Sequence, residues 1–110
     1  MDFNNATQAF AALSQETRLK VYKILMEYGS TGLAAGAISD QLGIPHNTLS
    51  FHLSHLSQAG LVSSRKEGRK VIYAANGQTV ESLILFLREN CCSASQEANE
   101  QCSPILKEKP

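Results

Sequence analysis

The sequence contains no run of 18 apolar residues, which is about the length a helix needs to span a membrane. Its opening stretch, MDFNNATQAF, also lacks a charged segment followed by an apolar one, so we expect no signal peptide. No internal repeat is present either. These absences predict a cytoplasmic protein with no membrane partner.

Net charge is absent as well, because 10 Lys and Arg residues balance 10 Asp and Glu residues. Total charge therefore says nothing about nucleic acid as a partner, but the distribution of charge is informative. Between Ser63 and Ala75, Glu67 is the only acidic residue, and it stands among four cations: Arg65, Lys66, Arg69 and Lys70. A local cluster of this kind can neutralise phosphates.

Cysteine is scarce, with three residues in the chain. An odd number of cysteines in a reducing compartment argues against a disulfide framework and favours thiol chemistry. At 110 residues with 43% hydrophobic content, the chain is long enough for one globular domain. Such a domain buries a modest core, so dimerisation would stabilise it.

Apolar periodicity and turn residues predict a mostly helical fold with one β-hairpin. We expect the first helix to be capped by Asn4 or Asn5 and to run to Leu13, and the second to be capped by Ser14 and to end at Gly29. Three more helices are expected at Ala34–Leu42, His46–Ala59 and Gln78–Asn90, and two strands at Leu61–Lys66 and Lys70–Ala75, joined by a turn at Glu67–Gly68.

The helix expected over His46–Ala59 has two different sides. Leu49, Leu53 and Leu56 follow each other at i, i+4 and i+7 and form an apolar stripe. The other side is mostly small and polar, which suits contact with base edges. We predict DNA contacts from this helix and from the hairpin by the following residues: His46, Asn47, Thr48, Ser50, Phe51, Ser54, Arg65, Lys66, Arg69 and Lys70.

Two features of this helix have alternative interpretations. Phe51 lies on the polar side, where it either contacts a thymine methyl group or packs against a neighbouring element. His52 and His55 have a spacing that metal ions use, but His52 borders the apolar stripe. A hydrogen-bonded core histidine is therefore the favoured interpretation of His52.

A winged helix-turn-helix has this order of elements: a short helix, a tight turn, a longer helix and a basic hairpin. The segments 12–19 (ALSQETRL), 48–53 (TLSFHL) and 59–62 (AGLV), with Gly68-Arg69 and Tyr73, resemble motifs of the ArsR/SmtB family of metal-responsive repressors. The resemblance implies a homodimer, joined through its first and last helices, that binds a palindromic operator in double-stranded DNA until an inducer releases it. It implies a regulator and not an enzyme.

Family members place their inducer sites differently. One type uses a Cys-x-Cys pair, and here those positions are Ala34 and Gly36; another uses Asp and His on the last helix, which here has no His. Both of these sites are absent. What remains is Cys91, Cys92 and Cys102, which resemble the C-terminal cysteines of arsenite-responsive members. That resemblance implies trivalent arsenic or antimony as the inducer, bound by three thiolates.

A thiol redox switch is the main alternative. Adjacent Cα atoms lie ~3.8 Å apart, below the ~4.4–6.8 Å usual for disulfides, so Cys102 is a better partner for Cys91 or Cys92 than they are for each other. We divide the chain into a DNA-binding and dimerisation domain, residues 1–92, and a flexible tail, residues 93–110. The operator sequence, and whether a cysteine site lies within one subunit or bridges two, are left open.

Overall fold

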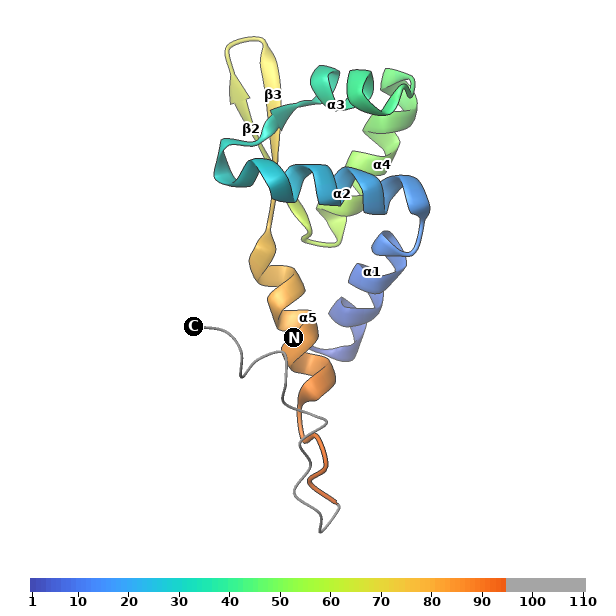
Figure 1. The fold of residues 1–110 in the computed structure, drawn as a ribbon, viewed down its shortest axis with the longest axis vertical. Helices are drawn as coiled ribbons and strands as arrows, with labels where there is room; N and C mark the ends of the chain where they lie inside the picture. Colours follow the sequence, from blue (N-terminus) through green and yellow to red (C-terminus); the bar gives the residue numbers. More distant parts are fainter. Residues whose placement is uncertain (95–110) are drawn as a thin grey trace.

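The computed structural model of the protein describes residues 1–94, and it is mostly helical with a small sheet (Figure 1). The helices are α1 (Phe3–Leu13), α2 (Glu16–Tyr28), the 3₁₀ turn η1 (Gly29–Thr31), α3 (Ala35–Leu42), α4 (His46–Gln58) and α5 (Gly77–Arg88). The strands are β1 (Leu33–Ala34), β2 (Val62–Glu67) and β3 (Lys70–Ala75). The predicted fold class, mostly α with a β-hairpin wing, is confirmed.

The first two helices are capped by residues other than those predicted. The carboxylate of Asp2 accepts a hydrogen bond from the backbone N–H of Asn5 at 2.7 Å and so caps α1, in place of Asn4 or Asn5. Ser14 ends α1, because its hydroxyl donates to the carbonyl of Ala11 at 2.9 Å. Gln15 caps α2 by accepting from the N–H of Arg18 at 2.9 Å.

The sheet has the antiparallel order β1-β3-β2. Strand β1 was not predicted: Ala34 pairs with Ile72 of β3 and precedes helix α3, so the predicted helix start at Ala34 is wrong by one residue. Gly32 makes this pairing possible. Its φ is +71°, and a Cβ atom there would lie 2.5 Å from the carbonyl oxygen of Tyr73. No other residue fits at this position without moving the backbone.

The hairpin turn lies one residue later than predicted. Glu67 pairs with Lys70, so Gly68 and Arg69 form a two-residue connection between β2 and β3. The φ angle of Gly68 is +63°, whereas the φ angle of Arg69 is negative. This combination is found in type II′ hairpin turns. This turn places Arg69 at the tip of the hairpin.

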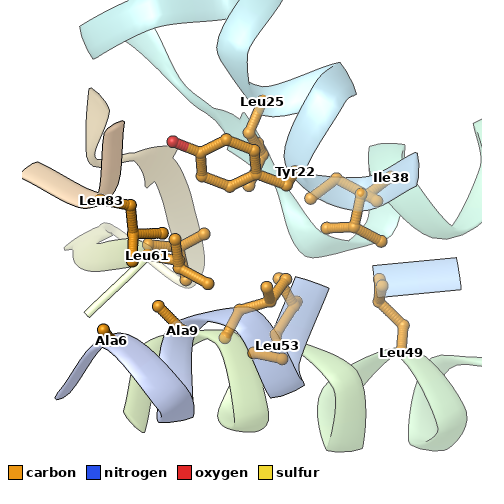
Figure 2. Close-up of a cluster of buried hydrophobic side chains, with 13 residues drawn as sticks. Ala6, Ala9, Tyr22, Leu25, Ile38, Leu49, Leu53, Leu61 and Leu83 are labelled. Atoms are coloured by element: carbon orange, nitrogen blue, oxygen red, sulfur yellow. The ribbon is translucent and has the colours of Figure 1, made fainter. Parts of the chain in front are cut away.

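The core lies where α1, α2, α4 and α5 converge (Figure 2). Leu25, Ile38, Leu49, Leu53, Leu56 and Leu61 are among its largest fully buried side chains. Helix α1 contributes the small residues Ala6, Ala9 and Ala12, which let its backbone approach closely. Tyr22 is buried too, and its hydroxyl donates to the carbonyl of Asn76 at 3.2 Å just before α5.

Helices α1 and α5 lie at the end of the molecule opposite the hairpin (Figure 1). Both expose apolar side chains there: Phe3 is 79% exposed, Leu85 52% and Leu87 65%. The rings of Phe3 and Phe86 meet edge to face with centroids 5.1 Å apart. Within residues 1–94, no helix has both the length and the apolar content needed to cross a membrane.

Candidate nucleic-acid interface

Helix α4 turns its leucine stripe inward and its polar side outward. Leu49 and Leu53 are each 1% exposed and Leu56 is fully buried, and Figure 2 shows Leu49 and Leu53 projecting from α4 toward the helices above it. The six residues of this helix predicted to contact DNA are all exposed: His46, Asn47, Thr48, Ser50, Phe51 and Ser54. The helix therefore presents a continuous polar surface, interrupted only by Phe51.

The first turn of α4 offers hydrogen-bond donors to an anion. Its N-cap residue, Pro45, has no side chain that can accept from the backbone N–H groups of that turn. The amide oxygen of Asn47 accepts from the N–H of Thr48 at 2.9 Å, which also fixes the Asn47 side chain at the exposed start of the helix. Backbone N–H groups at such a helix start favour phosphate oxygens.

The start of α3 joins the recognition surface of α4 to the hairpin. Asp40 and the first turn of α3 line a shallow hollow together with Arg69 and Lys70 of the hairpin. On the same turn, a Cβ atom at Gly36 would lie 3.6 Å from the imidazole of His46, the first residue of α4. The hairpin cations and the start of α4 therefore lie on either side of α3, along one surface.

Arg65 has a structural role that the sequence did not reveal. Its guanidinium donates to the carbonyl oxygens of Ser30 at 3.1 Å and Thr31 at 2.8 Å, and to the carboxylate of Glu67 at 2.8 Å. Arg65 thus fastens the hairpin to η1. Arg65 is nevertheless exposed, as are the other hairpin cations Lys66, Arg69 and Lys70, and DNA contact by all four stays a prediction.

Arg18 is a buried cation that contacts helix α4. Arg18 is 9% exposed, and its guanidinium donates to the carbonyl of Ala12 at 2.7 Å and to that of Ala11 at 3.5 Å. It also lies 3.4 Å from Nδ1 of His52. Because arginine can only donate, Nδ1 must accept, and the proton of the neutral imidazole is on Nε2. The predicted hydrogen bond of His52 is confirmed, but the side chain is half-buried at the edge of the core and not inside it.

The environment of His52 favours its neutral form. The pKa of His52 lies below its ordinary value of 6.5. The largest cause is partial burial, followed by the charge of Arg18 and then that of His55. Among residues 1–94, no group of three or more His, Cys, Asp or Glu side chains is arranged to hold a metal ion. Through these contacts Arg18 joins the end of α1 to the middle of α4.

Two of the three cysteines lie just beyond α5. Backbone hydrogen bonds from Cys91 to Arg88 and from Ser93 to Asn90 form successive tight turns there. The sulfur atoms of Cys91 and Cys92 are 3.6 Å apart. Cys102, the third predicted ligand, lies outside the described residues, as does all of the predicted tail beyond residue 94.

These elements define a class of protein. Helices α3 and α4, joined by a short turn, followed by a basic antiparallel hairpin, are a winged helix-turn-helix DNA-binding domain. A sequence model described as a helix-turn-helix domain matches residues 13–65.

Several known proteins are similar to this chain. The transcriptional activator HlyU of Vibrio cholerae is 33% identical over 77% of this chain and 76% of its own length. A probable mercury resistance operon repressor of Streptomyces lividans is 31% identical over 84% of this chain and 70% of its own length. Other similar proteins are also described as HTH-type transcriptional regulators.

A solved structure described as an ArsR-like transcriptional regulator from Rhodococcus sp. RHA1 superposes with a TM-score of 0.74. It is 28% identical and covers 86% of both chains. The protein belongs to the ArsR family of winged helix-turn-helix transcriptional regulators, as the motifs in its sequence implied. Its relatives are DNA-binding regulators and not enzymes.

Proposed function

We propose that the protein is a dimeric repressor that binds a palindromic operator and releases it when trivalent arsenic or antimony binds its cysteines. The observation that carries the first part is the separation of two exposed surfaces. The hairpin and the start of α4 lie toward one end of the molecule (Figure 1), while α1 and α5, which expose apolar side chains, lie toward the other. Dimerisation through the apolar end would leave both DNA-binding surfaces free.

The apolar end favours a second copy as the partner. Phe3, Leu85 and Leu87 are each more than half exposed, and burying such side chains stabilises an interface by about 1.5–3 kcal/mol each. A two-fold dimer presents the same surface from each subunit. Two recognition helices related in this way enter successive major grooves about 34 Å apart.

The geometry of Cys91 and Cys92 suits a shared thiophilic atom. Two thiolates bound at about 2.3 Å to one tetrahedral or pyramidal centre lie about 3.5–3.8 Å apart. The sulfur atoms of Cys91 and Cys92, at 3.6 Å, lie within that range, although Cys91 is disulfide-bonded in the structure and must be reduced before it can bind. Trivalent arsenic and antimony take three soft sulfur ligands, so Cys102 completes the proposed site.

The position of this pair suggests how an inducer acts on DNA binding. The cysteines directly follow α5, which also exposes Leu85 and Leu87 to the proposed partner subunit. A bound atom that draws Cys102 toward them reshapes the end of the dimer helix. That change alters the spacing of the two recognition helices, and the affinity for the operator falls.

Titration of operator DNA tests the inducer. Operator binding is followed by fluorescence anisotropy under reducing conditions with arsenite, antimonite or zinc. We expect release by arsenite or antimonite from the wild type, and none from Cys91→Ser or Cys92→Ser proteins that still bind the operator. Cys102→Ser should respond only at higher arsenite. Release of the double variant Cys91→Ser/Cys92→Ser at the wild-type arsenite concentration contradicts the site.

Thiol oxidation is a second candidate, favoured by Cys91, which is disulfide-bonded in the structure while Cys92 is a free thiol. It predicts release by peroxide without any metalloid, and recovery on adding a reductant. Arsenite added to the fully reduced protein separates the two candidates, because an oxidation switch does not respond to it.

A further inference from the structure

We infer that Phe51 recognises the 5-methyl group of a thymine in each operator half-site and so helps determine sequence specificity. This inference rests on the proposed operator binding by α4. The phenyl side chain of Phe51 is 66% exposed, although it belongs to a helix whose other large apolar side chains are buried. Contact with a binding partner would remove this ring from water.

The position of Phe51 along α4 puts its side chain among groups suited to base edges. Asn47 lies one turn before it and Ser54 nearly one turn after it, and both side chains are exposed. Residues at these spacings share one side of a helix. If Asn47 and Ser54 face the major groove, Phe51 faces it between them.

Two histidines hold the ring in place. The Phe51 ring meets those of His52 and His55 edge-on, with centroid distances of 6.1 and 6.2 Å. His52 is in turn anchored by Arg18. A ring supported at its base loses little rotamer freedom when it enters the groove, which reduces the entropic cost of binding.

The surroundings of Phe51 favour a base over a protein partner. The ring borders a shallow hollow whose other lining residues are Ser54, His55 and Gln58, all polar or titratable. The extended apolar surface of the molecule belongs to α1 and α5 instead. A single ring in polar surroundings fits one small apolar group among hydrogen-bonding ones. In the major groove that group is the thymine methyl, since the other base edges present donors and acceptors.

The experiment removes the methyl group while keeping every hydrogen bond of the base. An operator is selected from random duplexes with wild-type protein, and each thymine is then replaced in turn by uracil, symmetrically in both half-sites. We expect one replacement to weaken wild-type binding by about 4-fold per half-site, or about 15-fold in total, the effect of losing about one buried methyl group. Anisotropy titrations give the dissociation constants.

Three variants complete the design. Phe51→Ala should bind the thymine and uracil duplexes equally, whereas Phe51→Leu, which stays apolar, should keep much of the preference. Ser54→Ala, also exposed on α4, should change affinity without changing the thymine-to-uracil ratio. Because Phe51 is exposed, the variants should melt within a few degrees of the wild type, which circular dichroism checks.

Two results would overturn the inference and are distinguishable from failure of the proposed function. If wild-type protein binds a selected operator but every uracil replacement is neutral, Phe51 reads no methyl group. If Phe51→Ala keeps the wild-type thymine-to-uracil ratio, another residue reads it. If wild-type protein selects no duplex at all, the proposed operator binding fails and the inference fails with it.

Discussion

Helices α4 and α5 have 13 and 12 residues, yet they expose opposite kinds of surface. Helix α4 buries three leucines and shows a polar side, whereas α5 buries Leu83 and leaves Leu85 and Leu87 exposed. Water molecules hydrogen-bond to the polar side of α4, and in the proposed DNA complex phosphates and bases take their place. Exposed apolar surface on α5 has no such partner in water, so it favours association with another protein surface.

The largest effect is expected from breaking the apolar end. Leu85→Glu/Leu87→Glu places two charges on each side of the proposed interface, where they lose hydration without gaining a partner. We expect a monomer that binds the operator at least about 100-fold more weakly, because two half-sites no longer bind together. Sedimentation velocity and anisotropy measure the two effects.

A matched control for that experiment is Leu19→Glu. Leu19 is 45% exposed, like Leu85 at 52%, but it lies on α2, outside the α1–α5 surface. We expect this variant to remain a dimer with wild-type operator affinity. If it also dissociates, simple loss of surface hydrophobicity explains the result and the interface is wrongly placed.

On the polar side, Asn47→Ala should have the next largest effect. Removing a side chain that bonds to a base edge costs ~1–3 kcal/mol at the base it reads and relaxes the preference there. Selection with the variant should return a degenerate base at one position of each half-site. An unchanged selected sequence would place Asn47 outside base recognition.

Two arginines of the hairpin should behave differently. Arg69 is exposed at the tip, so Arg69→Ala should weaken binding to all duplexes and lower the salt slope by about one unit for each phosphate that it neutralises. Arg65 is held by Ser30, Thr31 and Glu67, so Arg65→Ala should lower the free energy of unfolding by about 1–2 kcal/mol. Equal melting temperatures for the two variants would contradict this division.

The smallest effect concerns the support behind α4. The pKa of His52 is lowered in the folded protein, so the unfolded chain binds a proton more readily. The free energy of unfolding should therefore decrease as pH falls through about 6.5, the unfolded value, and level off below the lowered pKa. His52→Asn keeps an acceptor for Arg18 but does not titrate. Urea unfolding from pH 5 to 8 should show a shallower dependence for this variant.

Much of the fold could be predicted because the helices have strong apolar periodicity. The ends of α4 and α5 and the start of β3 lie within two residues of their predicted places. The two-residue strand β1 was missed, since two residues carry no periodicity and pairing with β3 depends on contacts distant in sequence. The cap at Asp2 was missed because several polar residues compete at that helix start.

The candidate site also has features that the sequence predicts and features that it does not. The exposure of the polar residues on α4 could be predicted, because the spacing of its leucines shows which side of the helix is buried. The engagement of Arg65 with η1 does not, because Ser30 and Thr31 accept through backbone carbonyls that have no signature in the sequence. Arg18 stood within a motif that identified the family, but its contact with His52 spans 34 positions of the chain and required the structure.

The alanines of α1 have a consequence for local order. Ala6, Ala9 and Ala12 each bury roughly one methyl group, so their burial stabilises the docking of α1 by only about 1 kcal/mol each. In an isolated subunit, α1 should therefore open more often than α2 or α4, and its amide hydrogens should exchange with deuterium sooner. Pairing of two subunits would slow that exchange in α1 more than elsewhere. The N-terminal helix would then acquire much of its order from the neighbouring molecule.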